Sequence, residues 1–315
     1  MIFQYRRERA IFRAFFIGVL ISAACMSSAA FAVIKVVTTT TDLKSFVEYV
    51  GGDKVQVISM VSPGAEAEEY APKPQDLDRL KTANLVVRVG LDYDLWLDRM
   101  LRQTGRPELV KGGAAYVDTS NAIVLLEVKG GGIGGSSGGH AHGAGNPHYW
   151  LDPNNAAVIT GNIVEALARI DAPNAKYYEK QRIDFLAALD RKTLEWQEQL
   201  EPLRGKPLLT YHNNWPYFAR RFRLNFAGTL ESRPGVSPSA AELSRLLSKM
   251  GAENIHVIVK RPQEPNREVD FLAKKSGAQI AVLSTSVGDD GSKTYIQMMD
   301  NNIKNLLAAF NKNSK

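Results

Sequence analysis

The sequence predicts an α/β protein with two lobes of parallel sheet, joined by a long rigid helix, and a ligand site in the cleft between the lobes. Apolar runs rich in β-branched residues alternate with segments of helical periodicity. One periodic segment, residues 173–203, divides the chain, and the alternation restarts after it. In open α/β sheets, ligands bind beyond the carboxyl ends of the strands. Two such lobes facing each other therefore form one cleft.

Residues 1–32 have the features of a signal peptide. A segment with four arginines precedes an apolar run, Ala14–Ala24, which is too short for a typical transmembrane helix. The A-x-A pattern around Phe31 predicts cleavage after Ala32 and export to the periplasm. The sequence SAAC, which ends at Cys25, also resembles a lipoprotein cleavage site. A lipid-anchored form is therefore an alternative, although a serine stands where leucine is usual.

The exported chain has nearly balanced charge. The 315 residues carry a net charge of +6, but removal of residues 1–32 takes away four arginines and one glutamate, which leaves 35 basic and 32 acidic side chains, or +3. A nucleic-acid partner is therefore not expected. The single cysteine, Cys25, lies in the removed segment, so no disulfide and no thiolate ligand are expected. With 44% hydrophobic residues, the chain can bury the core of one large or two ordinary domains.

The first lobe is predicted over residues 33–172. Runs rich in Val and Ile favour strands, periodic segments favour helices, and the Gly51–Gly52 pair predicts the end of the first helix. Strands are expected at Ile34–Thr40, Lys54–Val61, Ala83–Gly90 and Ile123–Val128, and helices at Asp42–Gly52, Gln75–Thr82, Asp94–Leu101 and Asn154–Ala172. A glycine-rich loop of low complexity, residues 129–146, interrupts this lobe.

The linking helix is predicted over residues 173–203, and the second lobe over residues 204–315. At 1.5 Å per residue the link spans about 45 Å, which suits a strut between two lobes as well as a simple packing helix. The second lobe repeats the alternation. Strands are expected at Lys206–His212, Leu224–Leu230, Asn254–Lys260 and Gln279–Thr285, and helices at Asn214–Phe222, Ser239–Met250, Arg267–Gly277 and Thr294–Phe310.

Two histidines are candidate metal ligands. His148 lies in NPHYWLDP of the first lobe, and His212 follows a strand in LLTYHNNW of the second. Neutral imidazole is the commonest nitrogen ligand for zinc and related ions, so the pair predicts a metal held between the lobes. Each is alternatively a structural histidine. His256 falls within a predicted strand and is expected to be structural.

Carboxylates add two further candidates. Glu66, Glu68 and Glu69 crowd a proline-stiffened loop after the second strand, and Glu231 follows a strand of the second lobe. Each feature, taken alone, is also typical of a solvated acidic loop.

These motifs together resemble the ZnuA/TroA-like family of periplasmic metal-binding components of ABC transporters for zinc and manganese. The resemblance covers nearly the whole exported chain, and the segments that carry it are VTTTTDL, EYAPKPQDL, WLDRML, NPHYWLDP, YHNNWPYFARRF and TYIQMMDNN. It implies two α/β lobes bridged by a rigid helix, with one metal ion at their interface.

The resemblance also implies a set of ligands. His148 matches the family's second ligand and His212 its third. Glu68 stands where the first ligand is usually histidine, and Ser284 stands where the fourth is usually an acid. A serine is a poor ligand, so Glu231 is expected to complete the site. Asp289 and Asp290 are the alternatives to Glu231.

The predicted function follows from this set. The protein captures a divalent transition metal and delivers it to an inner-membrane ABC permease, as a monomer and without acting as an enzyme. Zn²⁺ is favoured, because affinity rises towards it along the first-row series and because His140 and His142 are similar to the histidine-rich loop of zinc carriers; Mn²⁺ and Fe²⁺ are alternatives. Trp150, Trp215 and Tyr211 are expected to shield the ion.

Other functions stay open at this point. A metal-dependent hydrolase fits two histidines and a glutamate, although no H-E-x-x-H motif is present. The same fold is also compatible with binding of a metal chelate, with a chaperone role that needs no permease, or with an adhesin-like role.

Overall fold

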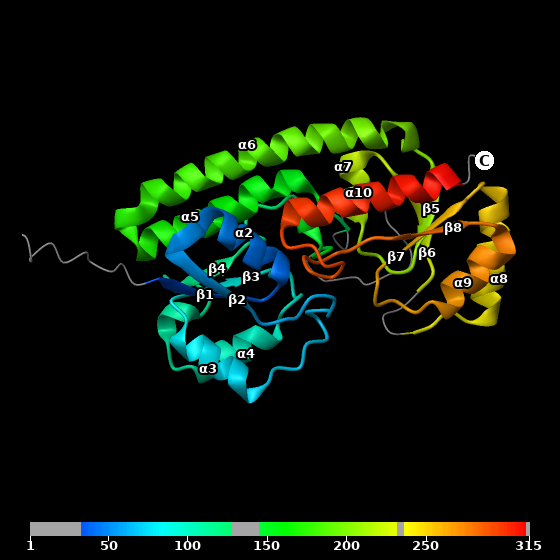
Figure 1. Ribbon diagram of the computed structural model, residues 1–315. Helices are drawn as coiled ribbons and strands as arrows, with labels where there is room; N and C mark the ends of the chain where they lie inside the picture. Colours follow the sequence, from blue (N-terminus) through cyan, green and yellow to red (C-terminus); the bar gives the residue numbers. More distant parts are fainter. Residues whose placement is uncertain (1–32, 128–144, 232–235, 313–315) are drawn as a thin grey trace, which may run out of the picture. The chain divides into compact units, whose positions relative to one another are not determined.

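Two four-stranded parallel sheets organise the structure (Figure 1). The computed structural model describes residues 33–127, 145–231 and 236–312. The first sheet has the strand order β2-β1-β3-β4 and the second β6-β5-β7-β8, so both lobes share one topology. The strands are β1 (Ile34–Thr38), β2 (Val55–Ser59), β3 (Leu85–Arg88), β4 (Tyr116–Asp118), β5 (Pro207–Thr210), β6 (Asn225–Thr229), β7 (Val257–Lys260) and β8 (Gln279–Val282).

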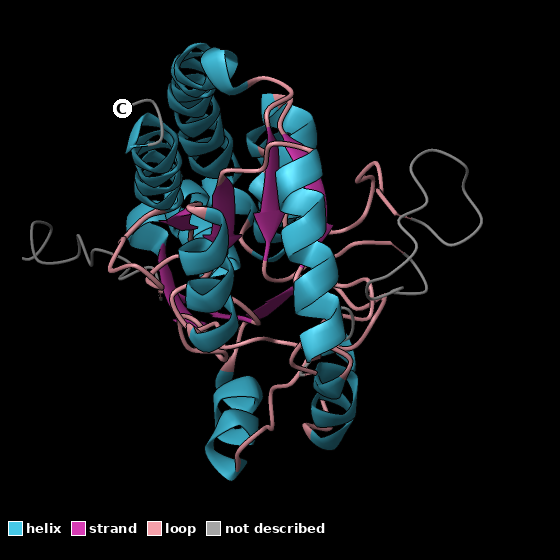
Figure 2. Ribbon diagram, turned by 90° about the vertical axis from the view of Figure 1, so that its right-hand side faces the viewer, coloured by secondary structure: helices cyan, strands magenta, loops and turns pink. Residues whose placement is uncertain are grey.

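Helices cover these sheets (Figure 2). In the first lobe α2 packs on β1 and β2, and α5 packs on β3 and β4; in the second lobe α9 and α10 pack on β8. The helices are α2 (Thr41–Gly51), α3 (Pro74–Thr82), α4 (Trp96–Gln103), α5 (Ala156–Ile170), α6 (Ala175–Leu200), α7 (Pro216–Phe222), α8 (Ala240–Ala252), α9 (Arg267–Ser276) and α10 (Tyr295–Lys312). Short 3₁₀ turns lie at Gly52–Lys54, Pro107–Leu109, Tyr149–Leu151, Pro153–Asn155, Ala172–Asn174 and Glu201–Leu203. The fold therefore has the predicted class, two parallel-sheet α/β lobes with a long helix.

Local sequence sets the ends of α2. The hydroxyl of Thr40 accepts a hydrogen bond from the Leu43 backbone N–H at 3.4 Å, which satisfies one of the donors left open at the start of a helix. Gly52 adopts a φ of 50° just after the helix, a left-handed conformation that side chains with a Cβ disfavour. The sequence TTTTD therefore leads directly from β1 into α2.

Helix α6 connects the lobes. At 1.5 Å per residue its 26 residues extend about 39 Å. Near its beginning, Phe185 stacks on Tyr49 of α2 with ring centroids 4.1 Å apart. Near its end, the Trp196 indole N–H donates to the Asp300 carboxylate of α10 at 2.9 Å. Because α6 is attached at both ends, it limits how far the lobes can separate.

Polar contacts across the lobes add to this restraint. Asp152, which follows the NPHYW segment, is 1% exposed and receives two hydrogen bonds from Arg221 of α7, at 2.6 and 3.1 Å. The Trp150 indole N–H donates to the Thr285 carbonyl at 2.8 Å, and the Tyr295 hydroxyl donates to the Trp150 carbonyl at 2.6 Å. The NPHYWLDP segment is thus fixed to the second lobe on both sides of Trp150.

Two expectations about strands were wrong. The fourth strand of the first sheet is β4, not Ile123–Val128. Ala122 and Glu127 have φ values of 68° and 57°, which are incompatible with an extended strand, and the Leu126 backbone N–H donates to the Tyr217 hydroxyl instead of to a neighbouring strand. His256 is exposed and precedes β7, so it is not within a strand.

Several predictions lie outside the described residues. These are the signal peptide 1–32 with Cys25, and the part of the Gly/His loop that carries His140 and His142. None of the described helices combines the length and the apolar composition needed to cross a membrane. The predicted limits 33–172, 173–203 and 204–315 stay predictions.

The Asp152–Arg221 pair predicts a stability difference between adjacent arginines. Arg221→Ala leaves a buried carboxylate without its bidentate partner and should lower the free energy of unfolding by about 3 kcal/mol. Arg220 lies 3.5 Å from the same carboxylate but is 42% exposed, so Arg220→Ala should cost less than about 1 kcal/mol. Denaturant unfolding of both variants measures this, and equal losses would contradict a special role for Arg221.

Candidate metal site

A cavity of about 220 Å³ lies where loops from both lobes meet. From the first lobe it is lined by the loop after β2, and from the second by the loops after β5, β6 and β7. Its lining residues are Glu66, Glu68, Glu69, Tyr211, His212, Glu231, Ser237, Arg261, Gln263, Glu264 and Pro265. Three of the four predicted ligands, Glu68, His212 and Glu231, therefore line one cavity at the carboxyl ends of the strands.

His212 and Glu231 form a close pair in this cavity. Nδ1 of His212 lies 2.6 Å from Oε2 of Glu231, and the two side chains are 16% and 9% exposed. A carboxylate can only accept, so Nδ1–H is the donor, and in the neutral ring Nε2 is the nitrogen that carries the lone pair. Carboxylates commonly hold metal-binding histidines in this way. The arrangement gives Glu231 an orienting role towards His212.

His148, the fourth predicted ligand, is 3% exposed and is not among the residues that line the cavity. Nδ1 of its ring lies 3.1 Å from Oδ1 of Asn146, and Nε2 lies 3.1 Å from Nδ2 of Asn214. Its ring centroid is 5.2 Å from that of Trp150, which agrees with the expectation that Trp150 lies near this ligand. His148 therefore touches the second lobe through Asn214, two positions after His212.

Tyr93 contacts both His148 and Glu66, a residue that lines the cavity. Its ring packs edge-on against the His148 ring, with centroids 5.4 Å apart, and its hydroxyl donates to Glu66 at 3.0 Å. Burial, followed by the nearby charge of Glu68, raises the pKa of Tyr93 well above its ordinary value, so the hydroxyl is a permanent donor. His148 and the glutamates of the β2 loop thus share one neighbour.

The ligand groups are not gathered around one point in this conformation. Across residues 33–127, 145–231 and 236–312, no three side chains of His, Cys, Asp or Glu are grouped so as to hold a metal ion. The four-residue ligand assignment from the sequence stays a prediction.

The loop after β8 does not line the cavity. Both backbone groups of Ser284 are bound by the Asn302 amide, at 2.7 and 2.8 Å. Asp289 bonds to Gln263, and Asp290 accepts from Asn301 at 2.7 Å. Ser284 and Asp290 thus have partners away from the lining of the cavity, whereas Asp289 contacts the lining through Gln263.

The two other aromatic residues expected near the ion differ in position. Tyr211 lines the cavity. Trp215 is 2% exposed and packs against Phe218 and Phe226, with ring centroids 5.7 and 6.4 Å apart. The ring of Trp215 therefore packs against other aromatic residues of the second lobe.

An ion pair across the cavity was not foreseen from the sequence. Arg261, just after β7, pairs with Glu66 of the first lobe and with Glu264 of its own loop, the latter at 3.0 Å. The available signal was its position at the carboxyl end of a strand, which is where ligand-binding loops lie in open α/β sheets. Asn146 and Asn214 were also missed, although NPH and HNN place an asparagine two positions from each histidine.

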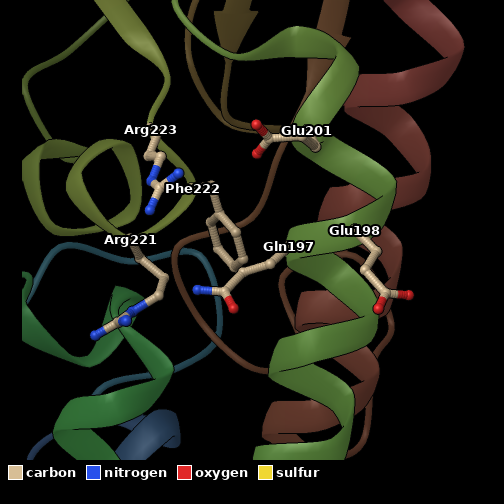
Figure 3. A pocket seen from close by; sticks show the side chains of 6 residues that line it. All are labelled: Gln197, Glu198, Glu201, Arg221, Phe222 and Arg223. Atoms are coloured by element: carbon tan, nitrogen blue, oxygen red, sulfur yellow. The ribbon is translucent and has the colours of Figure 1, made fainter.

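A second cavity, of about 280 Å³, lies between the end of α6 and the end of α7 (Figure 3). Its lining residues are Gln197, Glu198, Glu201, Arg221, Phe222 and Arg223. It contains no histidine, and Arg221 is already bound to Asp152. This cavity therefore offers two carboxylates, Glu198 and Glu201, but none of the imidazole donors that a site for a first-row metal ion favours.

Asp42 is a buried carboxyl at the contact between the lobes. It lies in the first turn of α2, and its Oδ1 accepts from the Val287 backbone N–H of the second lobe at 3.0 Å. Its Oδ2 has no hydrogen-bond partner among the described residues. Burial, with a contribution from the charge of Asp289, raises the pKa of Asp42 to about 7. This contact between the lobes is consequently sensitive to pH.

Comparison with known proteins shows the family of this chain. The model of the family described as the periplasmic zinc-uptake complex component ZnuA matches residues 36–309. The chain belongs to this family. The high-affinity zinc uptake system protein ZnuA of Bacillus subtilis (strain 168) is 27% identical over 283 residues, which cover 85% of each chain. The manganese ABC transporter substrate-binding lipoprotein PsaA of Streptococcus pneumoniae is 23% identical over 289 residues, 89% of each chain.

The fold agrees with a solved structure as well. A crystal structure of ZnuA superimposes with a TM-score of 0.74 at 25% identity, and the match covers 88% of this chain and 98% of that one. The resemblance noted in the sequence and the predicted fold class are therefore confirmed. The predicted function class, a substrate-binding component for metal uptake, is confirmed by the family, and the relatives give no support to the hydrolase alternative.

The buried Asp42 predicts a pH dependence of stability. Its pKa is about 7 in the folded chain and 3.8 ordinarily, so the folded state binds the proton more tightly. The free energy of unfolding should therefore fall as pH rises from about 4 to about 7, by up to about 1.4 kcal/mol per pH unit. Asp42→Asn keeps an acceptor for Val287 and should lack this fall. Denaturant unfolding of parent and variant from pH 4 to 8 measures the difference; parallel profiles would show that Asp42 does not titrate in this range.

Proposed function

We propose that this protein captures a divalent transition metal, with Zn²⁺ favoured, between its two lobes and delivers it to an inner-membrane ABC permease. The observation that carries the proposal is the pair His212–Glu231 in one cavity with Glu68 of the opposite lobe, in a chain of this family. The protein acts after export to the periplasm by its signal peptide, as a monomer, and makes or breaks no bond in its cargo.

The charge of the cavity supports a cation as cargo. Five glutamates and one arginine, Arg261, line it, which gives a formal charge of −4. Clefts lined by one sign of charge raise the local concentration of ions of opposite sign. A chelate that carries negative charge would be repelled, so the bare or hydrated metal ion fits this cavity better than an anionic chelate does.

The donor atoms suit a first-row divalent ion. Nε2 of His148 and Nε2 of His212 are the nitrogens that carry lone pairs, and Glu68 adds a carboxylate oxygen. Nitrogen and oxygen donors of this kind bind Zn²⁺, Mn²⁺ and Fe²⁺. Two imidazoles favour Zn²⁺ among these, because affinity for nitrogen sites rises along the series from manganese towards copper and zinc. Mn²⁺ and Fe²⁺ are the alternatives.

Capture requires the ligands to approach one another. The cavity of about 220 Å³ has the volume of about seven water molecules at ~30 Å³ each, so it is large enough for a hydrated ion. Exchange of water for protein donors then draws Glu68 and His148 towards His212. Because α6 and the Asp152–Arg221 pair restrain the lobes, small lobe shifts and loop movements bring about this closure and its reversal at the permease.

The two histidines and Glu68 provide the direct test of the site. His148→Ala and His212→Ala each remove a ligand and should weaken Zn²⁺ binding by at least about 100-fold, and Glu68→Ala should weaken it by a similar factor. His256→Ala is the matched control, because His256 is exposed ahead of β7, away from the cavity lining. Isothermal calorimetry measures the four variants. If Glu68→Ala binds as tightly as the parent, the assignment of Glu68 is wrong.

The identity of the cargo has its own test. Protein purified from the periplasm without added metal should contain about one zinc per chain by elemental analysis, and Zn²⁺ should displace Mn²⁺ in competition, since two imidazole donors favour it. If the protein contains manganese or iron in place of zinc, and if Mn²⁺ competes more strongly than Zn²⁺, the preference for zinc is wrong. This result would not contradict the assignment of the site itself.

A further inference from the structure

Asn146 determines which nitrogen of His148 carries the proton. Its Oδ1 faces the His148 backbone N–H at 3.0 Å, and its Nδ2 faces the Asn213 carbonyl, also at 3.0 Å. A backbone N–H can only donate and a carbonyl can only accept, so the orientation of the Asn146 amide is fixed. The same Oδ1 lies 3.1 Å from Nδ1 of His148, which must therefore carry the proton. Nε2 is the nitrogen with the lone pair.

Asn214 occupies the direction of this lone pair. Its Nδ2 lies 3.1 Å from Nε2 of His148 and donates to it. The Asn214 side chain is 0% exposed, and its Oδ1 has no hydrogen-bond partner among the described residues. A buried acceptor without a partner is destabilising, because the group has lost its hydrogen bonds to water and gained none in exchange. A buried amide oxygen thus lies without a hydrogen-bond partner next to a predicted ligand.

We propose that Asn214 is itself a metal ligand. Half a turn about its Cβ–Cγ bond exchanges the two ends of the amide, so that Oδ1 takes the position of Nδ2 beside Nε2 of His148 and both atoms bind one ion. This inference rests on the proposed function, because it assigns a further residue to the same site.

The distance between the two side chains supports this assignment. Two donor atoms that share a tetrahedral zinc ion at about 2.1 Å lie about 3.4 Å apart. The amide nitrogen is now 3.1 Å from Nε2, so the exchanged oxygen needs to move by only a few tenths of an ångström. In its present orientation the same amide donates to Nε2, so this ring nitrogen already acts as an acceptor.

Asn214 also supplies an oxygen donor that Ser284 does not provide. Ser284 stands where an acid was expected, and its backbone is held by Asn302 outside the cavity lining. Glu231 is engaged with Nδ1 of His212. An amide oxygen is a neutral, hard donor of the kind that suits manganese better than a third imidazole would. Asn214 should therefore reduce the preference of the site for Zn²⁺ over Mn²⁺.

The test uses two substitutions in the full exported chain, with Zn²⁺ and Mn²⁺ as separate probes in calorimetry. Asn214→Leu keeps the volume but removes the oxygen, and should weaken binding of both ions by at least about tenfold, more for Mn²⁺ than for Zn²⁺. Asn214→Asp keeps an oxygen, and should bind both ions at least as tightly as the parent. Thermal unfolding of the metal-free variants establishes that each one is folded.

Two outcomes would overturn the proposal. If Asn214→Leu binds as tightly as the parent or more tightly while His148→Ala loses binding, Asn214 only covers Nε2 and the proposed function stands without it. If His148→Ala binds as tightly as the parent, the site of the proposed function fails and this inference fails with it. If Asn214→Leu does not fold, Asn214→Asp provides the test instead. Weaker metal binding by folded Asn214→Asp than by the parent would also overturn the proposal.

A spectroscopic measurement separates ligation from a purely structural role. With Co²⁺ as the probe, the visible absorption bands depend on the number and type of donor atoms. Asn214→Leu should change the position and intensity of these bands at saturating Co²⁺, whereas His256→Ala should leave them as in the parent. Unchanged bands in Asn214→Leu would show that Asn214 does not touch the ion.

Discussion

The carboxyl ends of two parallel sheets meet at one cavity, and three of the four predicted ligands depend on that meeting. Glu68 follows β2, His212 follows β5 and Glu231 follows β6, so no lobe alone contains the site. The lobes are kept in this relation by α6, which is attached to α2 through Phe185 and to α10 through Trp196. Because α6 contacts both lobes, it restricts their relative motion to small shifts. Such restricted motion suits a protein that must hold an ion tightly and still release it.

The candidate ligands are oriented before any ion arrives. Glu231 binds Nδ1 of His212, and Asn146 binds Nδ1 of His148, so both rings present Nε2 as the nitrogen with the lone pair. The two partners differ in sequence distance: Glu231 is 19 residues from His212, whereas Asn146 is two residues from His148. Fixing the ring and its tautomer in advance reduces the entropy lost on binding and strengthens the imidazole as a donor.

The cavity also concentrates negative charge, and the mutual repulsion of its carboxylates opposes folding. Arg261 pairs with Glu66 and Glu264, and these pairs offset part of the repulsion while they connect the lobes. Glu68, Glu69 and Glu231 contribute the remaining negative charge of the lining. A divalent cation relieves this repulsion when it enters, so part of its binding free energy comes from charges that the fold has already brought together.

The alternation of strands and helices, the long helix between two lobes and the candidate histidines could be predicted from the amino-acid sequence, because these features depend on local periodicity and on short motifs. The prediction misplaced the fourth strand of the first sheet, because local composition does not reveal the positive φ values at Ala122 and Glu127 or the hydrogen bond of Leu126 to Tyr217, 91 residues away. Two contacts could be seen only in the folded chain: the pair Glu66–Arg261 and the contact of Asn214 with His148. They join residues that are 195 and 66 positions apart. Such contacts leave no periodic signal in the chain, since they arise only when two separately formed lobes pack together.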